Sequence, residues 1–201
     1  MAATYSELDE RLIKFILDQP MFFVATAPCL ESSGAGGHVN VSPKGYKDTF
    51  AVIDALTVAY LDLTGSGSET IAHLRQNGRI TIMFCSFDRS PKILRIYGRG
   101  EVIMPDDHRW DSFAPHFPAL RDGSVSFASL GDALDRGSQR AIIVVTADRI
   151  SDSCGYAVPV MELVEERDLL ARWAERKSAG ELAAYRVKHN TTSIDGLPAL
   201  T

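Results

Sequence analysis

Two short segments carry the residues best suited to binding an anion. The first is TGSGSET at residues 64–70, which follows an apolar run and precedes a helical pattern. Glycines let backbone N–H groups approach a phosphate, hydroxyl groups donate hydrogen bonds, and a helix N-terminus adds partial positive charge. The segment matches neither the Walker A pattern nor the G-x-G-x-x-G pattern, so neither of those mechanisms transfers to it. Taken alone, a capped helix after a Gly/Ser turn is the simpler interpretation.

The second segment is HVNVSPKG at residues 38–45. Polar residues alternate with apolar ones, so an extended strand would place His38, Asn40 and Ser42 on one face. Lys44 provides a compact positive charge suited to a phosphate or to a reduced flavin anion. Taken alone, an amphipathic strand that ends in a turn is again the simpler interpretation.

The other histidines and the cysteines show no spacing typical of metal ligands. The sequence contains no H-x-x-x-H, H-E-x-x-H or C-x-x-C pattern, which argues against a metal site. Cys29, Cys85 and Cys154 lie far apart in the sequence. An odd number of widely spaced cysteines indicates reduced thiols, and we therefore expect a cytoplasmic protein.

The composition excludes several classes of partner. The 201 residues carry a formal net charge of −5, and no run of Lys or Arg occurs. This balance argues against a nucleic-acid or anionic-membrane surface. No apolar stretch approaches the roughly 18 residues that a membrane span requires. The first residues are polar and acidic without a basic region, so we expect no secretory signal.

Hydrophobic periodicity and turn signals predict the elements that must position the two segments. Strands are predicted at residues 21–27, 38–42, 57–63, 79–87, 93–104 and 141–147. Helices are predicted at residues 5–19 (N-cap Ser6), at 66–78 (capping box of Ser66 and Glu69), from about residue 160, and near 180–188. Six strands with one brief helix between the third and fourth predict a mainly β (α+β) barrel with flanking helices and a C-terminal helical appendix. We expect a single domain over residues 1–201, with the barrel at about 20–150 and the helical extension at about 160–201.

In this order, HVNVSPKG, TVAYLDLTGSGSETIAHLRQNGRITIMF and KILRIYGRGEV resemble the pyridoxamine 5′-phosphate oxidase-like family of FMN-binding split barrels. The resemblance covers about residues 20–104 and extends more loosely to residue 150. It implies a six-stranded antiparallel split barrel that forms a homodimer, with FMN in each of two clefts between the subunits. The implied activity is that of an FMN-dependent oxidoreductase acting on a small-molecule substrate.

The resemblance also implies which positions bind the cofactor. The family holds the flavin phosphate with the strand that matches residues 39–44 and the turn that matches residues 64–70. The implied cofactor-binding residues are Asn40, Val41, Ser42, Pro43, Lys44, Thr64, Ser68, Thr70 and Arg95. Flavin chemistry requires no protein nucleophile, so the catalytic residue is open. His38 is a candidate proton donor to a reduced substrate, because it shares a strand face with Asn40.

Several departures from the family pattern bear on the substrate. Val39 stands where the true oxidases carry an arginine, and Glu69 and Thr70 stand where they carry an Arg-Lys pair. Ile93 replaces a glutamine, and the arginine-bearing C-terminal signature is absent. The loss of cations weakens the electrostatic case for a phosphate, and pyridoxamine phosphate is not the expected substrate.

These departures leave three alternatives open. The first is a reductase of the same fold that uses the deazaflavin F420. The second is a non-catalytic barrel that binds a flavin or haem. The third is a barrel with an empty cleft that serves as an interaction module, which Glu69 and Ile93 favour.

Overall fold

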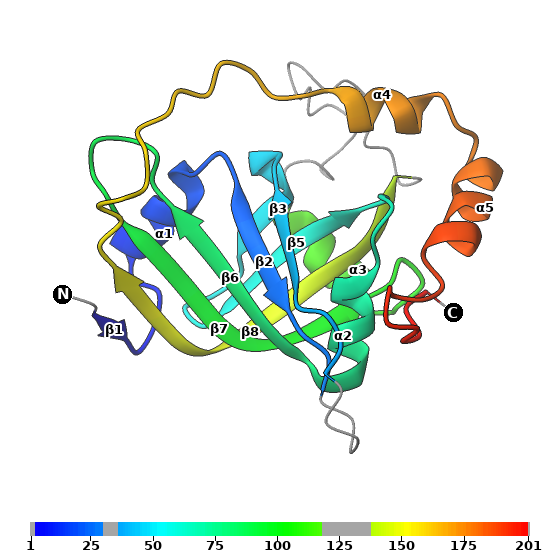
Figure 1. Cartoon of the computed structure of the whole chain (residues 1–201), viewed down its shortest axis with the longest axis horizontal. Helices are drawn as coiled ribbons and strands as arrows, with labels where there is room; N and C mark the ends of the chain where they lie inside the picture. The colour runs from blue at the N-terminus through cyan, green and yellow to red at the C-terminus, as the bar shows by residue number, and fades with distance from the viewer. Residues whose placement is uncertain (1–2, 30–35, 118–137, 201) are drawn as a thin grey trace.

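The structure is a computed structural model that describes residues 3–29, 36–117 and 138–200. At its centre one curled antiparallel sheet wraps around a hydrophobic core (Figure 1). The strands run in the order β3-β2-β6-β7-β8-β5-β4, and β1 pairs with β8 beside this path. Their bounds are β1 Thr4–Tyr5, β2 Phe22–Thr26, β3 Asn40–Lys44, β4 Phe50–Val52, β5 Thr57–Leu63, β6 Arg79–Cys85, β7 Ile93–Ile103 and β8 Gln139–Ser153. The predicted mainly β split barrel with flanking helices is confirmed.

The helices flank this sheet. Their bounds are α1 Glu10–Asp18, α2 Glu69–Asn77, α3 Trp110–Phe113, α4 Leu169–Glu175 and α5 Ala179–His189, with 3₁₀ turns η1 Lys47–Thr49 and η2 Ala114–His116. Helices α1 and α2 bury apolar side chains in the core, among them Leu12, Ile16 and Ile71. Figure 1 shows α4 and α5 at the edge of the barrel, from where the chain returns towards α2. None of the helices in the described ranges has the length and apolar character that a membrane span requires.

Four aromatic rings tie the strands together inside the barrel. The ring of Phe22 lies 4.9 Å from that of Phe50, 5.4 Å from that of Tyr60 and 5.7 Å from that of Phe84. These rings come from β2, β4, β5 and β6 and are all buried. Aromatic pairs at such distances stabilise a core beyond the area that they bury. The cluster therefore fixes β4 and β5 against β2 and β6.

The pairing of β7 with β8 contains an irregularity that depends on glycine. The register shifts between Tyr97 and Gly98, which is the signature of a β-bulge. A Cβ atom at Gly98 would lie 2.1 Å from the backbone oxygen of Thr146, so a side chain does not fit there. A bulge increases the local twist of a sheet, and we attribute part of the curl of this sheet to it.

Most predicted strands lie within two or three residues of the observed ones, with three differences. Strand β3 is shifted towards Lys44, and β8 is much longer than the predicted strand at 141–147. Strands β1 and β4, of two and three residues, were not predicted. Two or three residues are too few to show the alternation of polar and apolar residues that is typical of a strand. These strands are therefore recognised only by their pairing with a neighbouring strand.

The predicted helix starts at Ser6 and Ser66 are wrong. The N-cap of α1 is Asp9, whose carboxylate accepts from the backbone N–H of Leu12 at 2.8 Å. The N–H of Leu8 donates instead to the carbonyl of Ala55, which holds the preceding residues outside the helix. Helix α2 begins after Ser68, and no side-chain capping bond forms there. The capping box of this chain lies at α5 instead, between Ser178 and Glu181.

The predicted start of the next helix at about residue 160 is also wrong, since α4 begins at Leu169. Residues 159–168 are neither helix nor strand. The carboxylates of Glu162, Glu165 and Glu166 would stand three or four residues apart on a helix, where like charges repel. The N–H of Met161 donates to the carbonyl of Phe87 at 2.8 Å, so this end of the segment is held against the barrel.

Candidate functional site

A cavity of about 350 Å³ lies where β3 ends beside the start of α2. We call it the polar cavity. Four of the predicted cofactor-binding residues line it, namely Ser42, Pro43, Lys44 and Thr70. Its other lining residues are Gly45, Tyr46, Thr49, Leu61, Leu63, Gly65, Gly67, Glu69, Arg140 and Leu170. The structure thus brings the two segments singled out in the sequence to one place.

A chain of hydrogen bonds links the two segments directly. The side-chain amide of Asn40 donates to the hydroxyl of Thr70 at 3.1 Å. The hydroxyl of Ser42 in turn donates to Oδ1 of Asn40, also at 3.1 Å. Strand β3 holds these side chains on one face because successive strand residues alternate. Asn40 is therefore the connector between the end of the strand and the first turn of α2.

A buried charge network lies beneath the polar cavity. Asp62 and Arg140, with 1% and 4% of their side chains exposed, form an ion pair at 2.7 Å. The ammonium of Lys44 lies 3.0 Å from the other carboxylate oxygen of Asp62. Burial alone would raise the pKa of Asp62, but the charges of Arg140 and Lys44 outweigh it and lower that pKa. Asp62 is therefore ionised, and the three groups together keep one positive charge in excess.

Arg140 also fixes the turn between β5 and α2. Its Nη1 donates to the carbonyl of Gly67 at 2.7 Å. The side-chain amide of Asn190 donates to the carbonyls of Gly65 at 2.9 Å and Ser66 at 3.3 Å. The turn was expected to offer backbone N–H groups, and the structure shows its carbonyls held by these two side chains. Arg140 and Asn190 therefore bind three successive carbonyls and fix the shape of the turn.

Two predicted residues of the turn contact the far end of the chain. We call residues 186–199 the C-terminal segment. Nε and Nη2 of Arg186 donate to the hydroxyl of Thr64 at 2.9 and 2.7 Å. The hydroxyl of Ser68 donates to the carbonyl of Thr192 at 3.1 Å. Thr64 and Ser68 therefore position the C-terminal segment over the turn, and neither lines the polar cavity.

Val41 and Arg95 lie away from the polar cavity. Val41 is 62% exposed on β3 and pairs with Ala25. Arg95 lies on β7, and its guanidinium donates to the hydroxyl of Ser153 at 3.1 Å. Strands β2 and β6 separate β7 from β3, so Arg95 is three strands, on the order of 14 Å, from β3. The structure does not bring Arg95 together with Lys44.

His38 contacts the C-terminal segment as well. Its backbone N–H donates to the carboxylate of Asp195 at 2.8 Å, and its Nδ1 lies 2.7 Å from the other oxygen. The ring is 76% exposed and does not line the polar cavity. The hydrogen bonds from His38 lower the pKa of Asp195. The role of His38 as a proton donor remains a prediction. In the structure His38 contacts Asp195 of the C-terminal segment.

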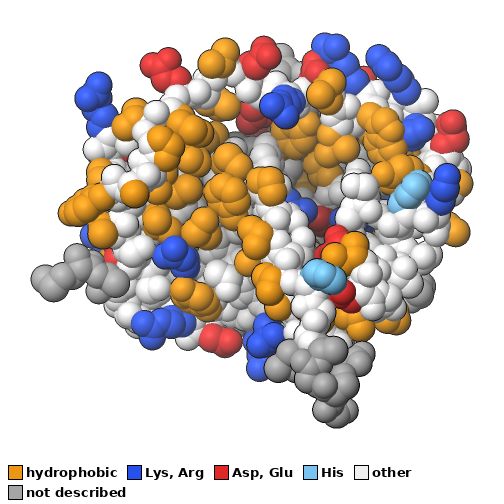
Figure 2. Space-filling view, viewed as in Figure 1, with side chains coloured by type: hydrophobic (Ala, Val, Ile, Leu, Met, Phe, Trp, Pro, Cys, Tyr) orange, Lys and Arg blue, Asp and Glu red, His pale blue; other side chains and the backbone are white. Residues whose placement is uncertain are grey.

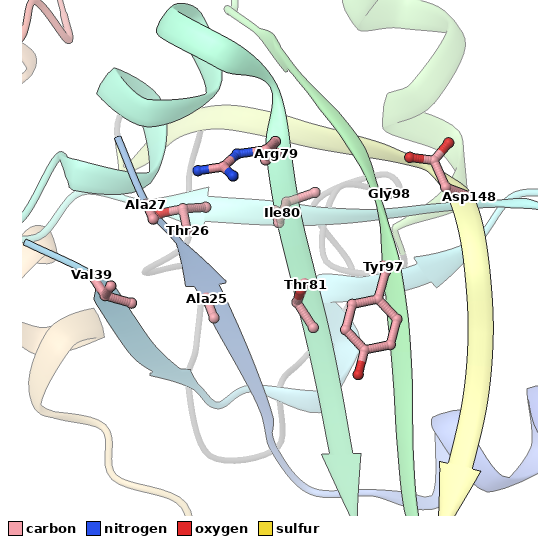
Figure 3. Close-up of a pocket in the computed structure, with 10 residues that line it drawn as sticks. All are labelled: Ala25, Thr26, Ala27, Val39, Arg79, Ile80, Thr81, Tyr97, Gly98 and Asp148. Atoms are coloured by element: carbon pink, nitrogen blue, oxygen red, sulfur yellow. The ribbon is translucent and has the colours of Figure 1, made fainter. Parts of the chain in front are cut away.

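A shallow depression of about 390 Å³ lies on the outer face of the sheet. Figure 3 shows that its lining comes from β2, β6 and β7 and from the residues beside them, with Val39 and Tyr97 on either side of Thr81. Hydrophobic side chains gather on this face of the molecule (Figure 2). Among the exposed ones are Val39, Val41 and Tyr97. Val39 therefore belongs to the outer face and not to the polar cavity.

The donor set of the polar cavity fits a phosphate group. Thr70 offers a hydroxyl and Lys44 offers an ammonium, both suited to phosphate oxygens, whereas the one proton of the Ser42 hydroxyl is already donated to Asn40. Glu69 also lines the cavity and opposes an anion. Lys44 and Arg140 balance the carboxylates of Asp62 and Glu69, and Arg186, which does not line the cavity, lies close enough to Arg140 for their charges to interact. Within the described residues, no group of three or more His, Cys, Asp or Glu side chains is placed to hold a metal ion.

Comparison with known proteins gives consistent matches. The family model described as pyridoxamine 5′-phosphate oxidase matches residues 8–154. The "pyridoxamine 5′-phosphate oxidase family protein ustO" of Aspergillus flavus is 39% identical over 214 residues, which cover 100% of this chain and 78% of that protein. HupZ of Group A Streptococcus is similar in structure at 20% identity, with a TM-score of 0.48 over 71% of this chain and 91% of its own. A pyridoxinephosphate oxidase family protein of Clostridium acetobutylicum matches at 16% identity, with a TM-score of 0.48 over 73% of this chain and 91% of its own.

Proposed function

The chain belongs to the pyridoxamine 5′-phosphate oxidase family, and from this premise we propose that it is an FMN-dependent oxidoreductase acting on a small molecule. The observation that carries the proposal is the polar cavity, where Ser42, Lys44 and Thr70 converge above the pair of Asp62 and Arg140. When bound, a flavin supplies the hydride or electron transfer, and the protein supplies binding, orientation and charge.

In this proposal the chain holds the flavin phosphate with groups that are already in place. Lys44 is fixed by Asp62 and also lies 5.7 Å from the centre of the Tyr60 ring, so its ammonium requires little reorganisation. Thr70 is oriented by Asn40. Arg140 keeps the carboxylate of Asp62 compensated, which leaves the charge of Lys44 available to an anion.

We further propose that two copies of the chain associate through the outer face of the sheet. Val39 and Val41 are 69% and 62% exposed there, beside the depression of Figure 3. Exposed apolar side chains that gather on one face are typical of an interaction surface. A second copy of the same face would cover these side chains.

The first experiment is the visible absorption spectrum of the purified protein, with mass spectrometry of any small molecule that co-purifies. A flavin spectrum supports the proposal, whereas a single deazaflavin band supports the F420 alternative. We expect FMN added to the cofactor-free protein to lose fluorescence on binding. A colourless protein that neither binds FMN nor gains thermal stability from it would overturn the proposal.

A pair of lysine variants tests the role of the polar cavity. Lys44→Met removes the ammonium but leaves Asp62 paired with Arg140, and we expect FMN affinity to fall about tenfold or more. Lys14→Met is the matched control, because Lys14 pairs with Asp18 on the exposed face of α1. FMN affinity that falls equally in both variants would contradict a specific role for Lys44.

Sedimentation analysis tests the homodimer. Val41→Lys places a charge on the outer face, and we expect it to convert a dimer into a monomer. Val187→Lys is the control, since Val187 is equally exposed but lies on α5. A wild-type protein that sediments as a monomer would contradict the dimer but would leave FMN binding to be judged by its spectrum.

A further inference from the structure

A second cavity, of about 560 Å³, adjoins the polar cavity. The two share Pro43, Gly45 and Tyr46 as lining residues. Residues 161–167, which we call the strap, cross this end of the barrel and form its other wall (Figure 1). We call this second space the strap cavity, and its volume lies in the range of small-molecule sites.

The apolar lining of the strap cavity comes from both the barrel and the strap. The barrel contributes Met21 and Phe87, and the strap contributes Met161 and Leu163. Both strap side chains are more than half exposed, so they do not belong to the core. Large apolar side chains that face a cavity instead of the core are suited to contact with an apolar ligand.

Hydrogen bonds fix the strap at both ends. The N–H of Met161 donates to the carbonyl of Phe87 at 2.8 Å, and the hydroxyl of Tyr46 donates to the carbonyl of Arg167 at 2.7 Å. Tyr46 has a φ of 62°, and within the described ranges it is the one non-glycine residue with a positive φ. Such a backbone conformation is costly and tends to occur at functional sites. The strained residue stands at the junction of the two cavities.

The strap gives this cavity a negative end. Glu162, Glu165 and Glu166 line it together with a single cation, Arg167. In the part of the chain that the structure describes, none of these three carboxylates forms an ion pair or a side-chain hydrogen bond. The pKa of Tyr46 is raised, first by burial and then by the charges of Glu166 and Asp168. The positive charge of Lys44 lies on the other side, in the polar cavity.

We propose that the strap cavity binds an apolar molecule that carries a cationic amine, and that this is the substrate class of the protein. The apolar body would contact Met21, Phe87 and Leu163, and the ammonium would face the carboxylates of the strap. The assignment of this amine as a substrate depends on the proposed oxidoreductase function. The preference of the cavity for an amine depends only on the residues that line it.

Titration calorimetry with three probes of similar shape tests this preference. The probes are 2-phenylethylamine, the neutral 2-phenylethanol and the anionic 3-phenylpropanoate. We expect the amine to bind most tightly and the anion most weakly. Equal affinities, or tighter binding of the anion, would overturn the proposal.

Paired variants identify the groups responsible. Glu165→Gln with Glu166→Gln should weaken amine binding about threefold to tenfold and leave the alcohol unchanged, as expected for two partly exposed charges. Glu7→Gln with Glu175→Gln makes the same change in net charge at exposed sites outside the cavity and should have no effect. If the two double variants behave alike, the strap carboxylates do not select the ligand.

A filling substitution tests the location. A Cβ atom at Gly45 meets no atom within 4 Å, so Gly45→Phe should fold and obstruct the junction of the two cavities. We expect all three probes to lose affinity in this variant, and unchanged affinity would place their site elsewhere. Flavin content is measured on the wild-type preparation used with the three probes, because Gly45 also lines the polar cavity. Flavin without amine preference overturns only the substrate class, and amine preference without flavin overturns only the oxidoreductase function.

Discussion

Nε and Nη2 of Arg140 both lie 2.7 Å from Oδ2 of Asp62, inside the barrel and almost fully shielded from water. The remaining donor group of Arg140 binds the carbonyl of Gly67. One side chain therefore compensates a buried carboxylate and also shapes the turn next to the polar cavity. Such a pair contributes little net stability when intact, but removal of one partner is costly.

Asp62→Asn should therefore destabilise the protein strongly. The substitution keeps the shape of the side chain but leaves Arg140 buried without an anionic partner. We expect the free energy of unfolding in urea to fall by about 3–5 kcal/mol. Asp107→Asn is the control, because Asp107 pairs with Arg109 at the surface and its loss should have only a small effect. Similar losses in both variants would contradict the importance of burial.

His73 should make stability depend on pH near neutrality. Burial lowers the pKa of His73, and the opposing charges of Asp195 and Glu69 do not restore it. The unfolded chain therefore takes up this proton first as the pH falls below about 6.5. We expect a higher free energy of unfolding at pH 8 than at pH 5.5. The difference should shrink in His73→Gln and persist in His116→Gln, since His116 is exposed. An unchanged difference in His73→Gln would assign the pH dependence to other groups.

Gly98→Ala should destabilise the barrel through its backbone. The added Cβ would approach the carbonyl oxygen of Thr146 within 2.1 Å, so β7 and β8 would have to separate at the bulge. We expect a loss of about 3 kcal/mol, measured by thermal or urea unfolding. Gly180→Ala lies in α5, where the Cβ meets no atom, and should be neutral or slightly stabilising. Equal stability of the two variants would show that the sheet accommodates the methyl group.

Asn190→Asp should release the C-terminal segment from the turn. The amide of Asn190 donates to the carbonyls of Gly65 and Ser66, and a carboxylate at the same place would face them with a negative charge. We expect a loss of about 2–3 kcal/mol, together with faster proteolysis near residues 186–199. Val187→Asp changes an exposed residue of the same segment and should leave proteolysis unchanged. Retained protection in Asn190→Asp would show that the remaining contacts of the segment, such as those of Arg186, Thr192 and Asp195, are sufficient to hold it.

The strands and α2 were predictable because their patterns are local. Residues 57–63 and 79–85 carry β-branched and apolar residues at strand spacing, and Gly78 ends α2 in the left-handed conformation that favours glycine. The extended conformation of the strap was not predictable, because contacts of Met161 and Arg167 with the barrel determine it. Tertiary contacts overrode a helical pattern there.

The candidate site likewise contains residues that could be predicted from the sequence and residues that could not. The resemblance implied Ser42, Lys44 and Thr70 as cofactor-binding residues, and the structure places all three at the polar cavity. Sequence reasoning missed Arg140 and Asn190, which reach the turn from 73 and 125 residues away along the chain. One signal was present. Asp62 interrupts an apolar strand, and a buried carboxylate requires a cationic partner from elsewhere in the sequence.

The long separation between Thr64 and Arg186, 122 residues, has a consequence during protein synthesis. At roughly 5–20 residues per second, a ribosome needs on the order of 6–24 seconds to add that stretch. During this interval the nascent chain already contains the turn. The side chains that donate hydrogen bonds to it, those of Arg140, Arg186 and Asn190, are still being added. The turn therefore reaches its final shape only late in translation, after most of the sheet has emerged.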